Sequence, residues 1–326
     1  MIDDPMLSIA MATYNGERFL REQLDSVLAQ TITDFEVIVC DDCSTDGTAA
    51  VLEEYARRDK RLKIYRNTHN IGFKKNFEQA IGLCKGDYIA LCDQDDIWYP
   101  DHLELLLKNI GDCVMCCGNS ELVDADNRSL GRNMSDSDGI HFVPVDKHKW
   151  LFRVMLHGSP FQGASMLLTA GFAKQCVPVP DCMSYHDVWI AGLACMTETG
   201  LNYIMQPVTR YRQHAENVTL GQYRDRKRTL KEKLDDYIGK IWNKNLMKTN
   251  RYAMSEELGK RCLEYNQKVG NPYYARIALF LNHSQAKRLD WRDMVFLWRN
   301  ISYITTTKTK RGVIRKWYVW THSVAE

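Results

Sequence analysis

Short apolar runs alternate with amphipathic stretches through the first 105 residues of this 326-residue chain. The runs have the length and composition of buried strands, and the stretches between them place apolar residues at helical spacing. Because strands that alternate with helices pair in parallel through right-handed crossovers, the pattern predicts an α/β fold with a mainly parallel sheet flanked by helices. The predicted strands are Leu7–Ala12, Phe35–Cys40, Leu62–Tyr65 and Tyr88–Cys92, and the predicted helices are residues 19–28, Thr48–Arg58 and Asn76–Cys84.

Three polar clusters come directly after predicted strands. They are Thr13–Gly16, Asp41–Gly47 and Asp93–Asp96. The carboxyl ends of parallel strands lie at one edge of the sheet, and ligands of such sheets bind outside that edge. We therefore expect the three clusters to contribute to one ligand-binding site.

The segment Asp93-Gln94-Asp95-Asp96 concentrates three carboxylates behind an apolar strand. Like charges repel, so a fold that forces them together normally supplies a hard cation such as Mg²⁺ or Mn²⁺, which prefers oxygen ligands. An isolated acidic tetrad is more often a solvated turn that caps the next helix. The apolar strand directly before Asp93–Asp96 favours a metal site instead.

The loop Asp41–Gly47 has two compatible interpretations. A carboxylate at a strand end can accept the ring N–H of uracil or thymine. Ser44, Thr45 or Asp46 can also cap the helix that follows. Taken alone, such a loop is more often a helix cap than a nucleotide site.

A set of short motifs shares its order and spacing with a known family. The motifs are Thr13-Tyr14-Asn15-Gly16, Gln30-Thr31 before Asp34-Phe35-Glu36, Asp41-Asp42-x-Ser44-x-Asp46-Gly47-Thr48, Asn70-Ile71-Gly72 with Asn76, Gly86-Asp87-Tyr88-Ile89, and Asp93-x-Asp95-Asp96 before Trp98-Tyr99-Pro100. Together they resemble the family 2 glycosyltransferases over about the first 105 residues, and more thinly to about Val218.

The resemblance implies a GT-A fold, a divalent Mn²⁺ or Mg²⁺ ion, and single-displacement transfer of a sugar with inversion at its C1. Tyr14 would flank the nucleotide base, and Asp42 would bind the pyrimidine N3–H. Asp93 and Asp95 would form the Asp-x-Asp metal motif, with Asp95 reaching the metal directly. The residues implied to bind the nucleotide sugar are Thr13, Tyr14, Asn15, Asp42, Asn76, Asp93 and Arg212, and Lys74 and Lys75 are further candidates to face the phosphate or ribose.

An inverting transferase needs a general base, which in this family lies about a hundred residues beyond the metal motif at the start of a helix. The segment Tyr185-His186-Asp187-Val188-Trp189 fits that position, and Asp187 is the candidate catalytic base. Such a carboxylate must be ionised and partly desolvated, so a modestly raised pKa would suit it. Without the resemblance, Asp187 would be interpreted as a helix cap.

The segment Tyr211-Arg212-Gln213-His214 resembles a basic motif of a subset of the family that includes rhamnosyltransferases. Arg212 would hold the diphosphate through its forked guanidinium. His214 would be a further metal ligand or phosphate contact, and a plain surface pair is an equally open interpretation. The motif favours dTDP-rhamnose as donor, with UDP-hexoses next.

The charge distribution divides the chain. Residues 225–326 carry a net charge of about +12 and residues 1–224 about −10. We predict a catalytic domain at 1–222, in which 1–105 bind nucleotide sugar and metal and 106–222 provide the acceptor side and the base. A helical basic region at 223–326 would follow. Basic residues with aromatics near the end of that region suit an anionic membrane surface, and packing on the acidic domain is equally open.

Composition sets the expected location. The chain has no apolar run long enough to span a bilayer, an acidic N-terminus and an odd number of cysteines, eleven. We therefore expect a cytoplasmic protein, free or at the inner face of the membrane, that does not bind nucleic acid. Its oligomeric state is left open.

The predicted function is inverting sugar transfer from a nucleoside-diphosphate donor to a glycan or lipid-linked acceptor in cell-surface polysaccharide synthesis. The alternatives are a catalytically silent GT-A module that binds glycan or nucleotide, and a nucleotidyltransferase.

Overall fold

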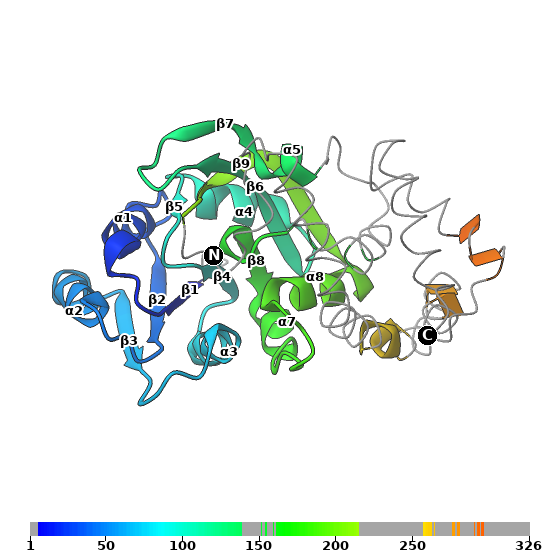
Figure 1. Ribbon diagram of the computed structural model, residues 1–326, viewed down its shortest axis with the longest axis horizontal. Helices are drawn as coiled ribbons and strands as arrows, with labels where there is room; N and C mark the ends of the chain where they lie inside the picture. The colour runs from blue at the N-terminus through cyan, green and yellow to red at the C-terminus, as the bar shows by residue number, and fades with distance from the viewer. Residues whose placement is uncertain are drawn as a thin grey trace, which may run out of the picture.

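The computed structural model describes residues 6–138 and 161–214, together with residues 151, 154, 159, 257–262, 264, 276–277, 279–280, 290, 292–293 and 295–296. The described strands form one nine-stranded sheet with the order β3-β2-β1-β4-β8-β6-β9-β5, and β7 pairs with β6 beside this path. Figure 1 shows the helices arranged around this sheet. The boundary predicted at residue 222 and the basic region 223–326 fall largely outside the described residues, so the domain division and the membrane contact stay predictions.

The N-terminal half of the sheet is parallel. Its strands pair in the order β3-β2-β1-β4, and one helix joins each strand to the next strand in the sequence. The prediction of a parallel βα unit with four strands is confirmed, with strand ends shifted by at most one residue. The elements are β1 (Leu7–Thr13), α1 (Glu17–Leu28), β2 (Phe35–Asp41), α2 (Thr48–Arg58), β3 (Leu62–Arg66), α3 (Phe73–Leu83) and β4 (Tyr88–Cys92).

The second half of the sheet is mixed. Strand β8 pairs antiparallel with both β4 and β6, and the long strand β9 pairs in parallel with β6. The β6–β7 hairpin was not expected, because the sequence between Cys113 and Gly139 has weak periodicity. Strand β9 was not expected either. The elements are β5 (Ile97–Trp98), α4 (His102–Ile110), β6 (Met115–Val123), β7 (Ser129–Asn133), α5 (Met134–Asp138), η1 (Gly163–Ser165), β8 (Met166–Thr169), α7 (Ala170–Gln175), α8 (His186–Met196) and β9 (Leu201–Arg212).

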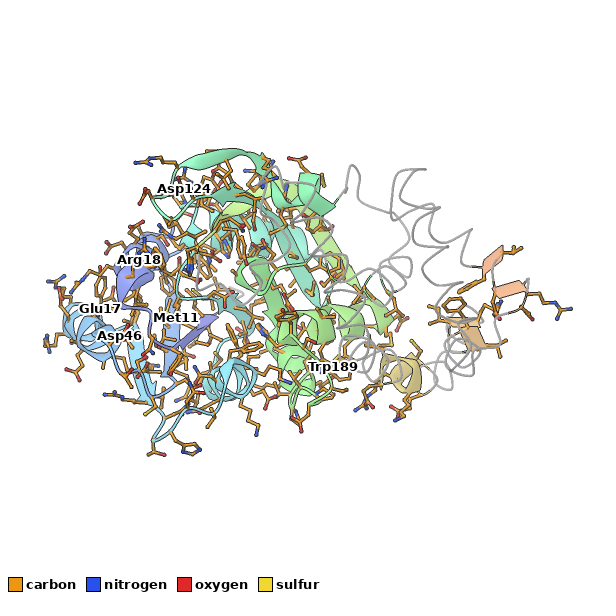
Figure 2. All side chains as sticks on the ribbon, in the orientation of Figure 1. Met11, Glu17, Arg18, Asp46, Asp124 and Trp189 are labelled. Atoms are coloured by element: carbon orange, nitrogen blue, oxygen red, sulfur yellow. The ribbon has the colours of Figure 1, made fainter. Side chains whose placement is uncertain are left out.

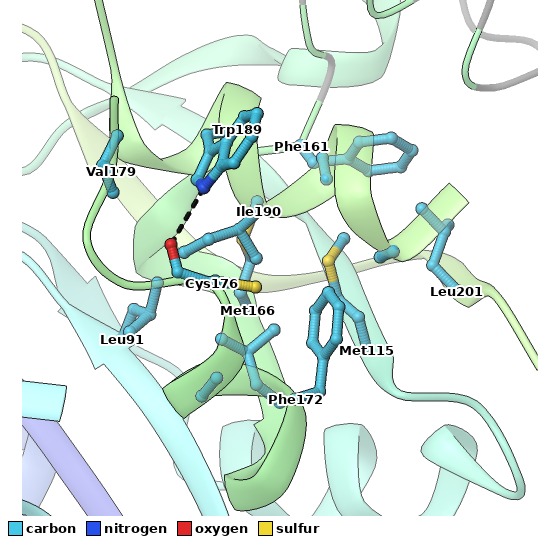
Figure 3. Close-up of a cluster of buried hydrophobic side chains, with 14 of the residues drawn as sticks. Leu91, Met115, Phe161, Met166, Phe172, Cys176, Val179, Trp189, Ile190 and Leu201 are labelled. Carbon is cyan, nitrogen blue, oxygen red and sulfur yellow. Dashed lines mark hydrogen bonds between the residues drawn. The ribbon is translucent and has the colours of Figure 1, made fainter. Parts of the chain in front are cut away.

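Two buried clusters lie on the two faces of the sheet, because alternate strand residues point to opposite sides. On β1, Ile9 and Met11 join the cluster with α1, α2 and α4, whereas Ala10 joins the one with α3, α7 and α8. Figure 3 shows part of the second cluster, where Trp189 of α8 buries its ring and donates from Nε1 to the Cys176 carbonyl at 2.9 Å. Burial on both faces explains why β1 and β2 are mostly apolar, with every residue of both strands buried.

Within the described part of the chain, no helix combines the length and the apolar character that crossing a bilayer requires.

A buried carboxylate supports the amino edge of the sheet. Glu36, on β2, accepts hydrogen bonds from Ser8 Oγ at 2.7 Å, from Lys63 Nζ at 2.7 Å and from the backbone N–H of Lys85 at 2.7 Å. Burial raises the pKa of Glu36, but the hydrogen bonds from Lys63, Ser8 and Lys85 outweigh it and leave that pKa below its usual value. The ionised carboxylate is therefore the form that the fold favours.

We expect Glu36→Gln to lower the free energy of unfolding by about 2 kcal/mol at neutral pH, the typical scale for hydrogen bonds to a charged group. Because the folded pKa is depressed, this contribution is full above the unfolded pKa near 4.5 and is lost as the pH falls through the folded value. Urea unfolding from pH 7 to pH 3 checks this. Glu54→Gln, which removes the surface ion pairs of Glu54 with Arg21 and Arg58, is the matched control and should change stability by less than about 1 kcal/mol. If Glu36→Gln lowered the free energy of unfolding equally at pH 3 and at pH 7, the proposed role of the ionised Glu36 carboxylate would be wrong.

Candidate active site

The loops that follow β1 and β2 are joined by side-chain hydrogen bonds. The Asn15 N–H donates to Ser44 Oγ at 2.9 Å, and Asn15 Oδ1 accepts from the Thr45 N–H at 2.8 Å. Asn15 has a positive φ of 49°, which an asparagine side chain tolerates better than most. Glu17 and Asp46, labelled close together in Figure 2, meet at the same junction, where the Glu17 N–H donates to Asp46 Oδ2 at 3.1 Å. Two of the three predicted polar clusters therefore form one surface.

The third cluster is connected to the first through Gln94. The Tyr14 N–H donates to Gln94 Oε1 at 2.8 Å, and Gln94 Nε2 donates to the Tyr14 carbonyl at 2.9 Å. This two-bond clamp fixes the backbone of Tyr14 while 45% of the residue stays exposed. Tyr14 is thus free to flank a base beside the acidic segment, and Gln94, which we had not singled out, is the residue that aligns it.

Asp42 organises the loop that precedes α3. Its carboxylate is buried and accepts from Asn67 Nδ2 at 3.0 Å and from the N–H groups of Ile71 and Gly72, both at 2.8 Å. Gly72 has a φ of 86°, a conformation that glycine adopts without strain. A carboxylate has about four acceptor positions, so the predicted contact with a pyrimidine N3–H stays open as a prediction.

Thr13 and Asn76 are buried and bind the protein itself. Asn76 Nδ2 donates to the Cys40 carbonyl at 2.7 Å, and its Oδ1 accepts from Asn67 at 3.1 Å. Thr13 Oγ1 donates to Asp41 at 3.3 Å. These contacts align the ends of β1 and β2, and direct contacts of Thr13 and Asn76 with a nucleotide sugar stay predictions.

Asp93 lies in a cluster of negative charge. Burial, the charge of Asp95 and the charge of Asp187 together raise the pKa of Asp93 to about 8. Asp187 is 94 positions away in the sequence, and the fold brings it close enough for its charge to affect the pKa of Asp93. Asp96 is fully buried, and burial with the charges of Asp95 and Asp93 holds its pKa well above the usual range. The donor set is oxygen-rich and short of positive charge, which fits a hard divalent cation.

His214 approaches the same carboxylates from the residues after β9. Its Nε2 lies 2.8 Å from Oδ2 of Asp95, and its ring packs on Phe19 with centroids 4.5 Å apart. Two donors this close would fit adjacent positions around one ion, and the role of His214 as a metal ligand stays a prediction. Among the described residues, no three His, Cys, Asp or Glu side chains form a ready-made metal-binding group. The metal assignment to Asp93, Asp95 and His214 is therefore a prediction that the donor chemistry supports.

Arg212 is fully buried and binds three parts of the chain. Its Nε donates to the Asp95 carbonyl, its Nη1 to the Ala125 carbonyl and its Nη2 to Glu22, each at 2.8 Å. Its backbone N–H donates to Asp96 at 3.0 Å. Through these contacts Arg212 positions the acidic segment Asp93–Asp96. Its contact with the diphosphate stays a prediction.

Asp187 lies in the first turn of α8, where it accepts a hydrogen bond from the Val188 N–H at 2.6 Å. Burial raises the pKa of Asp187 to about 6, although the N–H groups of Val188 and Gly163 partly oppose the rise. Beside it, His186 stacks on Phe77 with ring centroids 4.1 Å apart, and burial lowers the pKa of His186 to about 4. Asp187 is therefore a carboxylate that is ionised at neutral pH and still basic.

A known protein family matches the N-terminal part of the chain. Residues 8–166, just under half of the chain, match the model of glycosyl transferase family 2. Over these residues the chain is similar to that family. Over 253 residues it is 27% identical to an uncharacterized glycosyltransferase of Haemophilus influenzae, covering 73% of this chain and 76% of that protein. Over 198 residues it is 37% identical to an uncharacterized glycosyltransferase of Methanocaldococcus jannaschii, covering 59% of this chain and 66% of that one.

Solved structures with low sequence identity share the fold. The S. aureus TarS 1-349 structure in complex with UDP-GlcNAc has a TM-score of 0.55 at 16% identity, over 98% of this chain and 89% of that one. The mannosyltransferase PcManGT from Pyrobaculum calidifontis, in complex with GDP-Man and Mn²⁺, has a TM-score of 0.51 at 15% identity, over 99% of this chain and 87% of that one. The GT-A fold expected from the sequence of this chain is confirmed.

We expect Asp95→Ala to weaken Mn²⁺-dependent binding of UDP or dTDP by about 100-fold or more, because even an outer partner of a metal ligand is typically worth 10–100-fold. Titration calorimetry with and without Mn²⁺ measures the effect. Asp112→Ala, at an exposed position after α4, is the control and should bind like the wild type. Metal-dependent binding that survives the loss of Asp95 would remove this residue from the metal site.

Proposed function

We propose that this chain is an inverting glycosyltransferase that uses a nucleoside-diphosphate sugar and acts in cell-surface polysaccharide synthesis. The observation that carries the proposal is that the loops after β1, β2 and β4 form one surface, joined by the hydrogen bonds of Asn15 with Ser44 and of Tyr14 with Gln94. The charge of Asp187, which contributes to the raised pKa of Asp93, supports a carboxylate base near the same surface. The proposed acceptor is a hydroxyl of a glycan or lipid-linked saccharide.

In the proposed reaction, the acceptor hydroxyl gives its proton to the Asp187 carboxylate as its oxygen attacks C1 of the donor sugar. The bond between C1 and the diphosphate oxygen breaks, and its electron pair leaves with the nucleoside diphosphate. One bond forms as the other breaks on opposite sides of C1, so the configuration inverts without a covalent intermediate. The burial of Asp187 keeps its carboxylate basic enough to accept the proton.

The chain's other residues would hold the donor. Tyr14, fixed by Gln94, would cover the base beside Asp42. Mn²⁺ or Mg²⁺ held by Asp95 and His214, with Asp93 nearby, would offset the charge that develops on the leaving diphosphate. Arg212 would hold Asp95 in position through the hydrogen bond from its Nε to the Asp95 carbonyl. The motif Tyr211–His214 favours dTDP-rhamnose as donor, and UDP-hexoses are the next choice.

A thermal-shift panel of UDP, dTDP, GDP, CDP and their common sugar conjugates, with and without Mn²⁺, tests the donor assignment. A ligand that binds only the folded state raises the apparent melting temperature by mass action. We expect a metal-dependent shift with dTDP or UDP species. A panel without any shift would overturn the proposed function.

Asp187→Asn should lower sugar transfer by about 10²–10⁴-fold, the usual contribution of a general base, while nucleotide affinity stays within about threefold of the wild type. The variant keeps the size of the side chain and its place in the first turn of α8. Transfer is followed as nucleoside diphosphate release in the presence of acceptor, and affinity by calorimetry. Unchanged transfer would remove Asp187 from the role of base.

The pH dependence of kcat/KM gives a separate test. Because the base works only when deprotonated, we expect activity to be constant above the pKa of Asp187, about 6, and to fall tenfold per pH unit below it. The measurement is a rate profile from pH 4.5 to pH 8.5, with circular dichroism at each pH to show that the protein stays folded. A profile that is flat down to pH 5 would contradict the assignment.

A further inference from the structure

A pocket lies between the N-terminal half of α3 and the segment before α8. Its volume is about 450 Å³, and its walls include Phe73, Lys75, Pro178, Pro180 and Asp181. Ligand pockets commonly have volumes of about 300–1,000 Å³. No residue of this pocket takes part in the proton transfer or the metal site described above, so the mechanism leaves it without a role.

The pocket walls are held together by hydrogen bonds between distant parts of the chain. Lys74 Nζ donates to the Asp181 carbonyl at 3.2 Å and to the Met183 carbonyl at 2.8 Å. The Val179 N–H donates to Glu78 Oε1 at 2.7 Å. Two side chains of α3 thus fix the path of residues 179–183, and the pocket is a built feature of the fold. The expectation that Lys74 faces a phosphate or ribose is not supported by these contacts.

The pocket adjoins both halves of the candidate active site. At one end lie Ile71 and Gly72, whose N–H groups bind Asp42. The ring of Phe73 lies 6.3 Å from that of Tyr185 and 6.2 Å from that of His186. Asp187 is the next residue along the chain. A molecule packed on Phe73 would therefore lie close to the ring of Tyr185, two residues before the candidate base.

The chemistry of the walls fits a sugar ring. Phe73 is 37% exposed and offers an aromatic face, and the apolar rings of Pro178 and Pro180 also line the pocket. A pyranose has apolar C–H faces that pack on such rings, and hydroxyls at its edge that need hydrogen-bond partners. The lining contains two lysines, Lys74 and Lys75, and two carboxylates, Glu78 and Asp181, and of these Lys74 and Glu78 also bind residues 179–183. These charges sum to zero, which favours a neutral sugar over a uronate or a phosphate.

We propose that this pocket binds a neutral hexopyranose unit of the acceptor glycan. The inference rests on the proposed function, because only a glycosyltransferase brings an acceptor to Asp187. The bound unit would place the growing end of the glycan next to the base. Selectivity for the acceptor would then come from α3 and residues 178–181, separately from the contacts that select the donor.

Saturation-transfer NMR on the full chain tests the pocket. The probes are the methyl glycosides of glucose, galactose, N-acetylglucosamine and rhamnose, with methyl glucuronide as the anionic comparison. We expect at least one neutral glycoside to bind with a dissociation constant of about 10 mM or tighter, and methyl glucuronide to bind at least fivefold more weakly. Phe73→Ala should weaken binding at least fivefold, and Phe73→Trp should restore it.

Tyr65→Ala is the matched control, because Tyr65 is an aromatic residue of the same 37% exposure on β3, outside the pocket. It should leave glycoside binding unchanged. The inference is wrong if no glycoside of the panel binds, if binding survives Phe73→Ala, or if UDP or dTDP displaces the glycoside. Nucleotide thermal shifts on the same samples report the proposed function separately. Nucleotide binding without glycoside binding would overturn the pocket assignment alone.

Discussion

The buried guanidinium of Arg212 is the interaction on which the active-site edge depends. A charge without exposure to water is tolerated only when hydrogen bonds and opposite charge surround it, and here it contacts three segments far apart in the sequence. Those segments are the acidic tetrad after β4, helix α1 and the turn after β6. The ring of Phe19 covers the guanidinium, with 4.7 Å between its central carbon and the ring centroid. The position of Asp95 is thus set by the end of β9.

The parallel half of the fold was predictable because its signals are local. Each strand of that half is a short apolar run followed by a polar turn, and each helix shows its own periodicity. Strand β9 gives no such signal. It pairs with β6 some ninety residues earlier, changes register twice along that pairing, and alternates poorly because several of its residues are partly exposed. Long-range pairing of this kind depends on the rest of the sheet being present.

The site residues also divide into what the sequence could predict and what it could not. The prediction that Asp93, Asp95 and Asp187 belong to one site came from the resemblance to a family, since no local pattern connects positions so far apart. Neither the local pattern nor the resemblance predicts which way each polar side chain points. Asp42, Asn76 and Arg212 were expected to contact the donor, and the described hydrogen bonds of all three are with the protein. Buried polar groups must find partners, and the fold supplies them before any ligand arrives.

The charges at this edge determine how a donor can approach. Asp93, Asp95, Asp96 and Asp187 concentrate negative charge, and the guanidinium of Arg212 donates hydrogen bonds to Glu22 and to two backbone carbonyls. A nucleoside diphosphate is itself strongly negative, so its approach to these carboxylates is opposed by repulsion in a partly desolvated site. A divalent cation removes that opposition only if it contacts both the carboxylates and the diphosphate. We therefore expect donor binding and metal binding to be coupled at this edge, whereas the proposed neutral ligand of the pocket beside α3 would require no cation.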